Sequence, residues 1–184
     1  MQTSTTAKFE CQRCGNCCRR RENIPLTLDD IFRISDFLNM DQNEFFNEYC
    51  VEIAADSGYI PLPYLRREYY GCRFLEDGLC SINFVKPHVC KTMPSTIFSD
   101  VNNLKRQMPF NCSIQKMDKT EKVNDNDRIR KSYLASMMLT TIYYSKYGTF
   151  KYELAKPFVY RILLFNKNRE YVYRMFDNTV TVQN

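Results

Sequence analysis

The chain has 184 residues, of which 44% are hydrophobic, 26% charged and 14% aromatic, and its formal net charge is +5. This length allows one domain with a buried core, and the composition is that of a folded protein. No run of eighteen apolar residues occurs, and residues 1–9 contain one lysine and no apolar core. The sequence therefore predicts neither a membrane span nor an export signal, and we expect a cytoplasmic protein.

The first predicted feature along the chain is a cysteine motif of the form C-x2-C-x2-C-C, made by Cys11, Cys14, Cys17 and Cys18. Thiolates are soft, anionic donors that bind zinc or iron–sulfur clusters, and two-residue spacing lets a short turn aim successive sulfurs at one centre. Adjacent side chains leave a helix about 100° apart. We therefore expect Cys17 and Cys18 to serve different centres, or one centre with a separate thiol beside it.

A helix is predicted over residues 27–38, directly after the motif and its three arginines. Thr27 is a good N-cap, Asp29 and Asp30 fall in the first turn, and apolar residues follow at helical spacing. The Asn39-Met40 dipeptide is expected to end this helix.

A second, shorter helix is predicted to begin at Asp41, because Glu44 three residues later completes a capping-box pattern. Cys50 falls on the apolar face of this helix. A lone cysteine in that position is typically a small buried hydrophobic residue, so we expect Cys50 in the core and not at a metal.

From Gly58 to Cys112, prolines and glycines divide the chain into short runs, which predicts loops and short elements. Metal coordination supplies the ordering energy that such an irregular segment lacks. The single histidine, His88, lies here, two residues before Cys90. An ordinary polar loop histidine is the simplest interpretation; a metal ligand or a hydrogen-bond donor to a sulfur is the alternative.

The last third of the chain contains no cysteine and is predicted to be helical. Residues 125–147 have helical spacing up to Gly148, and residues 150–176 continue as helix with an interruption near Pro157. Residues 119–184 hold 12 Lys or Arg against 6 Asp or Glu, and eight of the thirteen tyrosines. Without a recognised reader motif, this pattern favours amphipathic helices with solvated charges over nucleic-acid binding.

The eight motif and downstream cysteines are the predicted metal ligands, because thiols in a reducing compartment bind metal more often than they form disulfides. They are Cys11, Cys14, Cys17, Cys18, Cys72, Cys80, Cys90 and Cys112. The C-x2-C-x2-C spacing is that of three ligands of a bacterial [4Fe–4S] cluster, whose fourth ligand is a remote cysteine. The ferredoxin continuation C-x3-C-P is absent, and the downstream cysteines form no zinc knuckle, so a [4Fe–4S] cluster is favoured and zinc remains the alternative.

The sequence resembles the CxxCxxCC cysteine-cluster family, also called the YkgJ-like zinc- or iron-chelating domain, over about residues 9–115. The resemblance rests on the cysteine motif, on the Ile24-x-Leu26-Thr27-x2-Asp30-Ile31 segment and on the Pro87-x2-Cys90 segment. It implies metal or iron–sulfur binding by the eight cysteines, and a methylase role in relatives that modify flagellin lysines. Lys86 and Lys91 stand where the family commonly has arginine, which weakens any anion site there.

We therefore expect a mainly α fold: a small irregular metal-organised cysteine domain at residues 1–118 and a basic, tyrosine-rich helical extension at residues 119–184, packed on it as one unit or separate. Three functions remain open: a redox or protein-modifying factor with a cluster, a zinc-organised interaction module, and a metal carrier. The expected partner is a protein or a protein substrate; a membrane is not expected, and nucleic-acid binding is disfavoured. No catalytic or substrate-binding residue is identified, and the sequence leaves open whether the chain is an enzyme.

Overall fold

The structure is a computed structural model that describes residues 6–7, 15–20, 23–54, 60–69, 71–92, 105, 113–116, 122–123 and 127–167. The α-helices of this part are α1 (Asn16–Arg20), α2 (Leu28–Phe37), α3 (Gln42–Tyr49), α4 (His88–Thr92), α6 (Asp127–Tyr147) and α7 (Tyr152–Lys167), and a 3-10 helix, η1, covers Ser113–Lys116. The strands are β1 (Thr6–Ala7), β2 (Ile24–Pro25), β3 (Cys50–Ala54), β4 (Pro61–Leu65), β5 (Arg67–Glu68), β6 (Gly71–Cys72), β7 (Leu75–Glu76), β8 (Leu79–Cys80) and β9 (Lys122–Val123).

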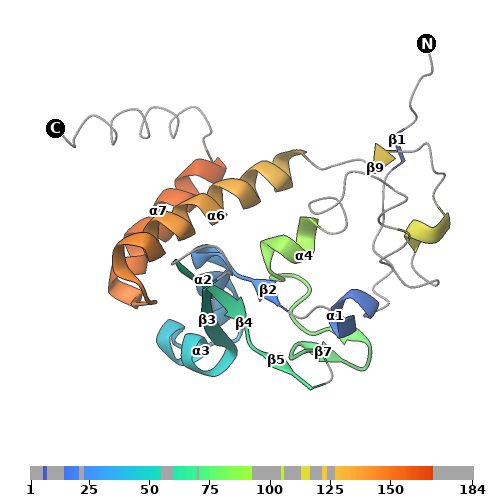
Figure 1. Cartoon of the computed structure of the whole chain (residues 1–184), viewed down its shortest axis with the longest axis horizontal. Helices are drawn as coiled ribbons and strands as arrows, with labels where there is room; N and C mark the ends of the chain where they lie inside the picture. The colour runs from blue at the N-terminus through green and yellow to red at the C-terminus, as the bar shows by residue number, and fades with distance from the viewer. Residues whose placement is uncertain are drawn as a thin grey trace, which may run out of the picture.

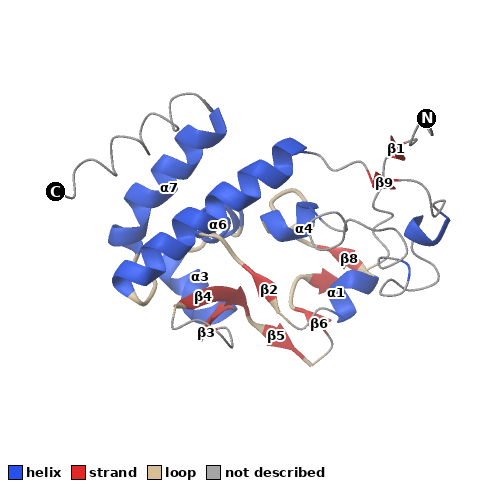
Figure 2. Ribbon diagram, turned by 45° about the horizontal axis from the view of Figure 1, so that its top comes forward, coloured by secondary structure: helices blue, strands red, loops and turns tan. Residues whose placement is uncertain are grey.

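The largest sheet of the described residues has three antiparallel strands in the order β2-β4-β3 (Figure 2). Leu65 of β4 lies opposite Ile24 on one side and Cys50 on the other. Strands β5 and β6 form one small antiparallel pair, β7 and β8 form a second, and β1 pairs with β9 in parallel. The expectation of a mainly α fold is therefore corrected to a mixed fold. The short helices and the C-terminal helices are confirmed.

Helix α2 begins and ends where its sequence predicts. The Thr27 hydroxyl accepts the Asp30 N–H at 3.3 Å, and the Asp30 carboxylate accepts the Thr27 N–H at 3.1 Å, which completes a capping box. Leu38 caps the other end, and Asn39 follows with φ 54, a left-handed conformation that asparagine tolerates better than most residues. This local chemistry fixes the helix that carries Asp29 and Asp30.

Helix α3 is shorter than its sequence pattern suggests, and Cys50 lies beyond its end. Asp41 is the N-cap, as expected, and accepts the N–H groups of Asn43 and Glu44. The helix stops at Tyr49, and Cys50 opens β3, so the prediction of Cys50 on a helix face is wrong. The pairing of β3 with β4 over five residues outweighs one further helical turn. Cys50 is nevertheless 2% exposed, which confirms its place in the core.

The C-terminal helices α6 and α7 lie side by side along one side of the molecule (Figure 1). Gly148, at φ 72, ends α6 as predicted. Helix α7 continues through Pro157, contrary to the predicted interruption, and residues beyond 167 lie outside the described part. Proline removes one hydrogen bond near the start of α7, and the burial of Ala155, Val159 and Ile162 offsets that loss.

One hydrophobic core joins the C-terminal helices to the cysteine-containing part. Its fully buried side chains come from the strand β2 to helix α2 segment, from α3, from the residues after β8 and from α6 and α7; the largest are Leu26, Leu28, Ile31, Ile34, Phe45, Ile82, Tyr143, Tyr144 and Ile162. Helix α6 contacts α2, α4 and β4, and α7 contacts α2. The α6–α7 turn is also held by Glu52 of β3, which accepts the Phe150 N–H at 2.8 Å. This packing places α6 beside the segment that carries Cys90.

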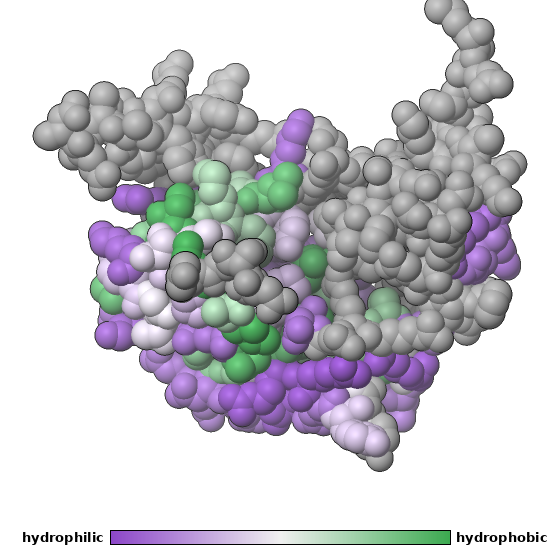
Figure 3. All heavy atoms as spheres, viewed as in Figure 1, coloured by the Kyte–Doolittle hydropathy of each residue, from purple (hydrophilic) through white to green (hydrophobic). Residues whose placement is uncertain are grey.

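The helices of the described residues include no candidate membrane span. None of the helices there combines the length and the apolar character needed to cross a membrane. Figure 3 shows a hydrophilic band along the edge of the molecule where α3 and β5 lie in the same view.

Candidate metal centre

Helix α1 brings two cysteines of the motif together at the surface of the small hairpins. Gly15 precedes the helix at φ 70, and its carbonyl accepts the Arg19 N–H at 3.1 Å. The sulfurs of Cys17 and Cys18 lie 4.0 Å apart, and both residues are half-buried. The two neighbouring side chains therefore converge more closely than their helical angle alone suggests.

Gly71 allows β6 to lie directly against α1. A Cβ atom at this position would meet the Cys18 carbonyl oxygen at 2.7 Å and the Arg19 Cα at 2.8 Å, and the φ of Gly71 is 117. Only glycine satisfies both conditions. The following residue is Cys72, so the close approach places this remote cysteine next to the motif.

A second glycine contact holds the β7–β8 hairpin against the start of α1. A Cβ at Gly15 would lie 2.7 Å from the Gly78 carbonyl oxygen. The hairpin turns at Asp77 and Gly78, which both have positive φ, as a two-residue Asp-Gly turn requires. Cys80 ends the hairpin, paired with Leu75. The Asp-Gly dipeptide is the sequence signal for this hairpin, whereas the spacing of prolines and glycines predicted only loops and short elements here.

Charge interactions connect the thiol of Cys18 with those of Cys17, Cys72 and Cys90, and the thiol of Cys72 with those of Cys17 and Cys80. The hydrogen bond with Cys17, burial, and the charges of Cys17, Cys72 and Cys90 together raise the pKa of Cys18. Burial raises the pKa of Cys72, as do the charges of Cys80 and Cys17, while a backbone N–H at Phe74 opposes them. These cysteines come from α1, β6, β8 and α4, which are far apart in sequence. Thiolates so placed repel one another, and a bound cation reverses that repulsion.

This donor set fits a zinc ion or an iron–sulfur cluster, because both bind through thiolate sulfur and both tolerate partial burial. Of the predicted ligands, Cys17, Cys18, Cys72, Cys80 and Cys90 are thus connected by charge interactions, although among the described residues no three cysteine sulfurs lie within 4.8 Å of one another. The other three, Cys11, Cys14 and Cys112, lie outside the described residues. Cys50 stands apart as a core residue, and its burial raises the pKa of its thiol.

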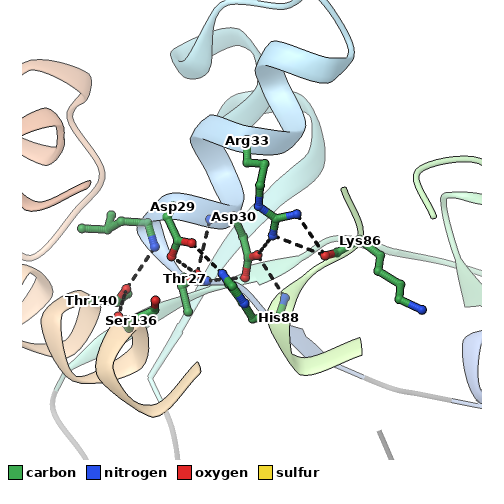
Figure 4. A network of polar contacts seen from close by, with 9 residues as sticks. Thr27, Asp29, Asp30, Arg33, Lys86, His88, Ser136 and Thr140 are labelled. Atoms are coloured by element: carbon green, nitrogen blue, oxygen red, sulfur yellow. Dashed lines mark hydrogen bonds and ion pairs between the residues drawn. The ribbon is translucent and has the colours of Figure 1, made fainter. Parts of the chain in front are cut away.

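A buried polar network lies at the start of α4, the helix that carries Cys90 (Figure 4). The sequence did not predict this network. The His88 Nε2 lies 2.6 Å from Asp29 Oδ2, and the His88 backbone N–H donates to Asp30 Oδ1 at 3.0 Å. Arg33 forms an ion pair with Asp30 and donates to the Lys86 carbonyl at 3.3 Å. His88 is therefore part of a buried ion network and not an ordinary loop histidine.

The two neighbouring carboxylates of this network have opposite pKa shifts. Burial favours the neutral form of Asp29, but its hydrogen bond and charge interaction with His88, and the Thr27 hydroxyl, hold the pKa of Asp29 below its usual range. Burial and the charge of Asp29 raise the pKa of Asp30. The first-turn position of both aspartates was visible in the sequence, but their contact with His88 spans 58 and 59 residues of chain and was not.

The ligand atoms of Asp29, Asp30 and His88 lie within 4.8 Å of one another, which among the described residues makes them a candidate hard-donor metal site. The carboxylate oxygens already accept hydrogen bonds, however, from the Thr27 hydroxyl and backbone N–H, from Arg33, and from the ring and backbone of His88. The carboxylates are thus saturated, as in a structural network and unlike a metal site, whereas the buried His88 Nδ1 has no hydrogen-bond partner in the described part of the structure.

Comparison with known proteins places this centre in a family. Neither the curated proteins nor the solved structures gave a match to the chain. A family model described as "Putative zinc- or iron-chelating domain" matches residues 10–126, which contain all eight predicted cysteine ligands. This region is more than half of the chain, and the chain therefore belongs to the CxxCxxCC family of zinc- or iron-chelating domains.

Proposed function

We propose that this protein binds metal through thiolates contributed by the C-x2-C-x2-C-C motif and the downstream cysteines, and that the principal centre is a [4Fe–4S] cluster. The observation that carries metal binding is the 4.0 Å approach of the Cys17 and Cys18 sulfurs on α1, against which the Gly71 contact packs the strand that carries Cys72. The charge of Cys90 acts on Cys18 and adds a third segment, and these thiols offer a soft donor set.

The motif spacing supports a cluster in preference to a single ion. In this proposal Cys11, Cys14 and Cys17 bind three corners, and a downstream cysteine binds the fourth. When bound, such a cluster supplies one-electron redox chemistry. The chain's own contribution is to hold the segments that carry the ligands: α1 contacts β6, and α4 contacts α6. A partly accessible centre allows a redox or protein-modifying role. The family resemblance implies such a role, as a methylase, for some relatives.

A zinc-organised module is the second candidate, and one distance favours it. Four sulfurs bound at about 2.3 Å to one zinc ion lie about 3.8 Å apart, close to the 4.0 Å between Cys17 and Cys18. Cluster thiolates bind different iron atoms and therefore lie farther apart. In the cluster proposal, Cys18 is then a thiol beside the cluster or a ligand of a second centre.

Metal analysis of protein purified without oxygen separates the two candidates. The cluster proposal predicts brown protein with visible absorption that bleaches on reduction, and iron and inorganic sulfide in equal amounts. Colourless protein with stoichiometric zinc and no sulfide would contradict the cluster and support the zinc-organised module. Protein that takes up neither metal would contradict metal binding itself.

A further inference from the structure

The position of Cys90 is the least locally determined of the described ligands. Helix α4, which carries it, has five residues, and a helix this short is not stable by itself. The Pro87 carbonyl accepts the N–H groups of Cys90 and Lys91 at 2.8 and 3.1 Å, but Pro87 itself precedes the helix. Something outside α4 must therefore fix where this helix starts.

Helix α2 supplies that external support on both sides of Pro87. Asp30 accepts the His88 N–H, and Arg33, oriented by its ion pair with Asp30, donates to the Lys86 carbonyl. Asp29 holds the His88 ring at 2.6 Å. These contacts hold the Lys86 carbonyl before Pro87, and the backbone N–H and the ring of His88 after it (Figure 4).

The support is itself anchored to the C-terminal helices. The Leu28 N–H, at the start of α2, donates to the Thr140 hydroxyl at 3.0 Å, and that hydroxyl donates to the Ser136 carbonyl at 2.8 Å. Thr140 and Ser136 are both fully buried in α6. A polar connection thus runs from α6 through the first turn of α2 to the first turn of α4.

We propose that Asp29 and Asp30 are positioning residues for the metal centre: through His88 and Lys86 they set the place of Cys90 relative to Cys18. This inference rests on the proposed metal centre and adds residues that are not themselves ligands. The buried carboxylates then serve the centre as outer groups that orient a ligand, a role whose loss typically costs 10- to 100-fold in metal affinity.

Cobalt(II) is the probe for the test, because each thiolate bound to cobalt adds to a near-ultraviolet charge-transfer band, whereas oxygen and imidazole ligands do not. Asp30→Asn is the main variant, with Asp29→Asn beside it and Cys90→Ser as the reference for loss of one sulfur. Glu52→Gln is the matched control. It makes the same carboxylate-to-amide change in another network, at the α6–α7 turn, where Glu52 accepts hydrogen bonds from Thr149 and Phe150.

We expect Asp30→Asn to reduce the band by the same fraction as Cys90→Ser and to speed release of cobalt to a chelator at least about tenfold, with Glu52→Gln unchanged. In the metal-free protein, the Cys90 amide should exchange its hydrogen faster in Asp30→Asn than in Glu52→Gln. A full-intensity band with unchanged release in Asp30→Asn would overturn the positioning role. Loss of one cobalt equivalent with an intact band would overturn it too, since the carboxylates would then be ligands of an oxygen-rich site.

The outcome for the wild-type protein keeps the two proposals distinguishable. If wild-type protein shows no charge-transfer band, the proposed thiolate centre fails. If wild type shows the band and Asp30→Asn keeps it, the centre stands and only the positioning role fails.

Discussion

At the scale of single residues, glycine determines how closely the cysteine segments approach. Gly71 touches the backbone of Cys18 and Arg19, and its φ of 117 lies where side chains are rarely accepted. Gly148 also has a positive φ, of 72, but a Cβ there would meet nothing within 4 Å. A substitution at Gly148 therefore measures the cost of the unusual backbone conformation alone. A substitution at Gly71 adds the cost of pushing β6 away from α1.

Gly71→Ala should therefore lose most of the bound metal, because β6 must move by about an ångström and take Cys72 with it. Gly148→Ala should keep full metal content and lower the free energy of unfolding by about 1–2 kcal/mol, the cost of the backbone conformation alone. Metal content by elemental analysis and stability by denaturant titration check both. Equal metal content in the two variants would show that the contact at Gly71 does not determine the site.

Cys50 gives a second prediction at this scale, because it is the one cysteine of the described part assigned to the core. Cys50→Ala should leave the metal-to-protein ratio unchanged and cost about 1 kcal/mol of stability from the lost sulfur contact. The same two measurements apply. A fall in metal content comparable with that of Cys90→Ser would contradict the assignment.

At the scale of elements, the sequence predicted well where local chemistry determines the structure. The N-cap of α2, the stop at Asn39 and the end of α6 at Gly148 each depend on a few adjacent residues. Strand β3 depends instead on pairing with the next strand, β4, and helix α4 depends on the Asp29–Asp30 pair far back along the chain. Residue types and spacing identified the cysteines as candidate ligands; the glycine contacts that join them arise only in the folded chain.

The same contrast predicts how the elements respond to metal removal. Helix α1 and the two hairpins have few buried apolar side chains, so metal-free protein should lose amide protection there. Helix α6 should keep its protection between residues 136 and 147, where Ser136, Thr140, Tyr143 and Tyr144 are fully buried. Hydrogen exchange with and without metal measures this. Unchanged protection at Cys72 and Cys80 after metal removal would show that packing, not metal, orders the hairpins.

At the scale of the whole molecule, the C-terminal helices are structurally continuous with the cysteine-containing part. They bury apolar side chains against α2 and β4, and α6 contacts the helix that carries Cys90. We propose that residues 119–184, which carry the positive net charge of the chain, also form the side of the molecule that recognises a protein partner or substrate.

Deletion of residues 119–184 should therefore expose the core and destabilise the metal centre together. We expect a truncated chain that binds a hydrophobic dye and retains less metal than the full chain, because Leu28 and Tyr144 belong to one core. A truncated protein that stays monomeric, keeps its metal and binds no dye would show that the C-terminal segment is independent of the centre.

In our proposal, cysteine sulfur binds the metal and the Asp29–Asp30–His88 network does not. X-ray absorption at the edge of the metal that copurifies with the protein tests it most directly, because sulfur and oxygen or nitrogen ligands lie at different distances. A shell of sulfur at about 2.3 Å, reduced in Cys90→Ser and unchanged in Cys50→Ala, is the predicted result. A shell of oxygen and nitrogen alone at about 2.0–2.2 Å would contradict the claim.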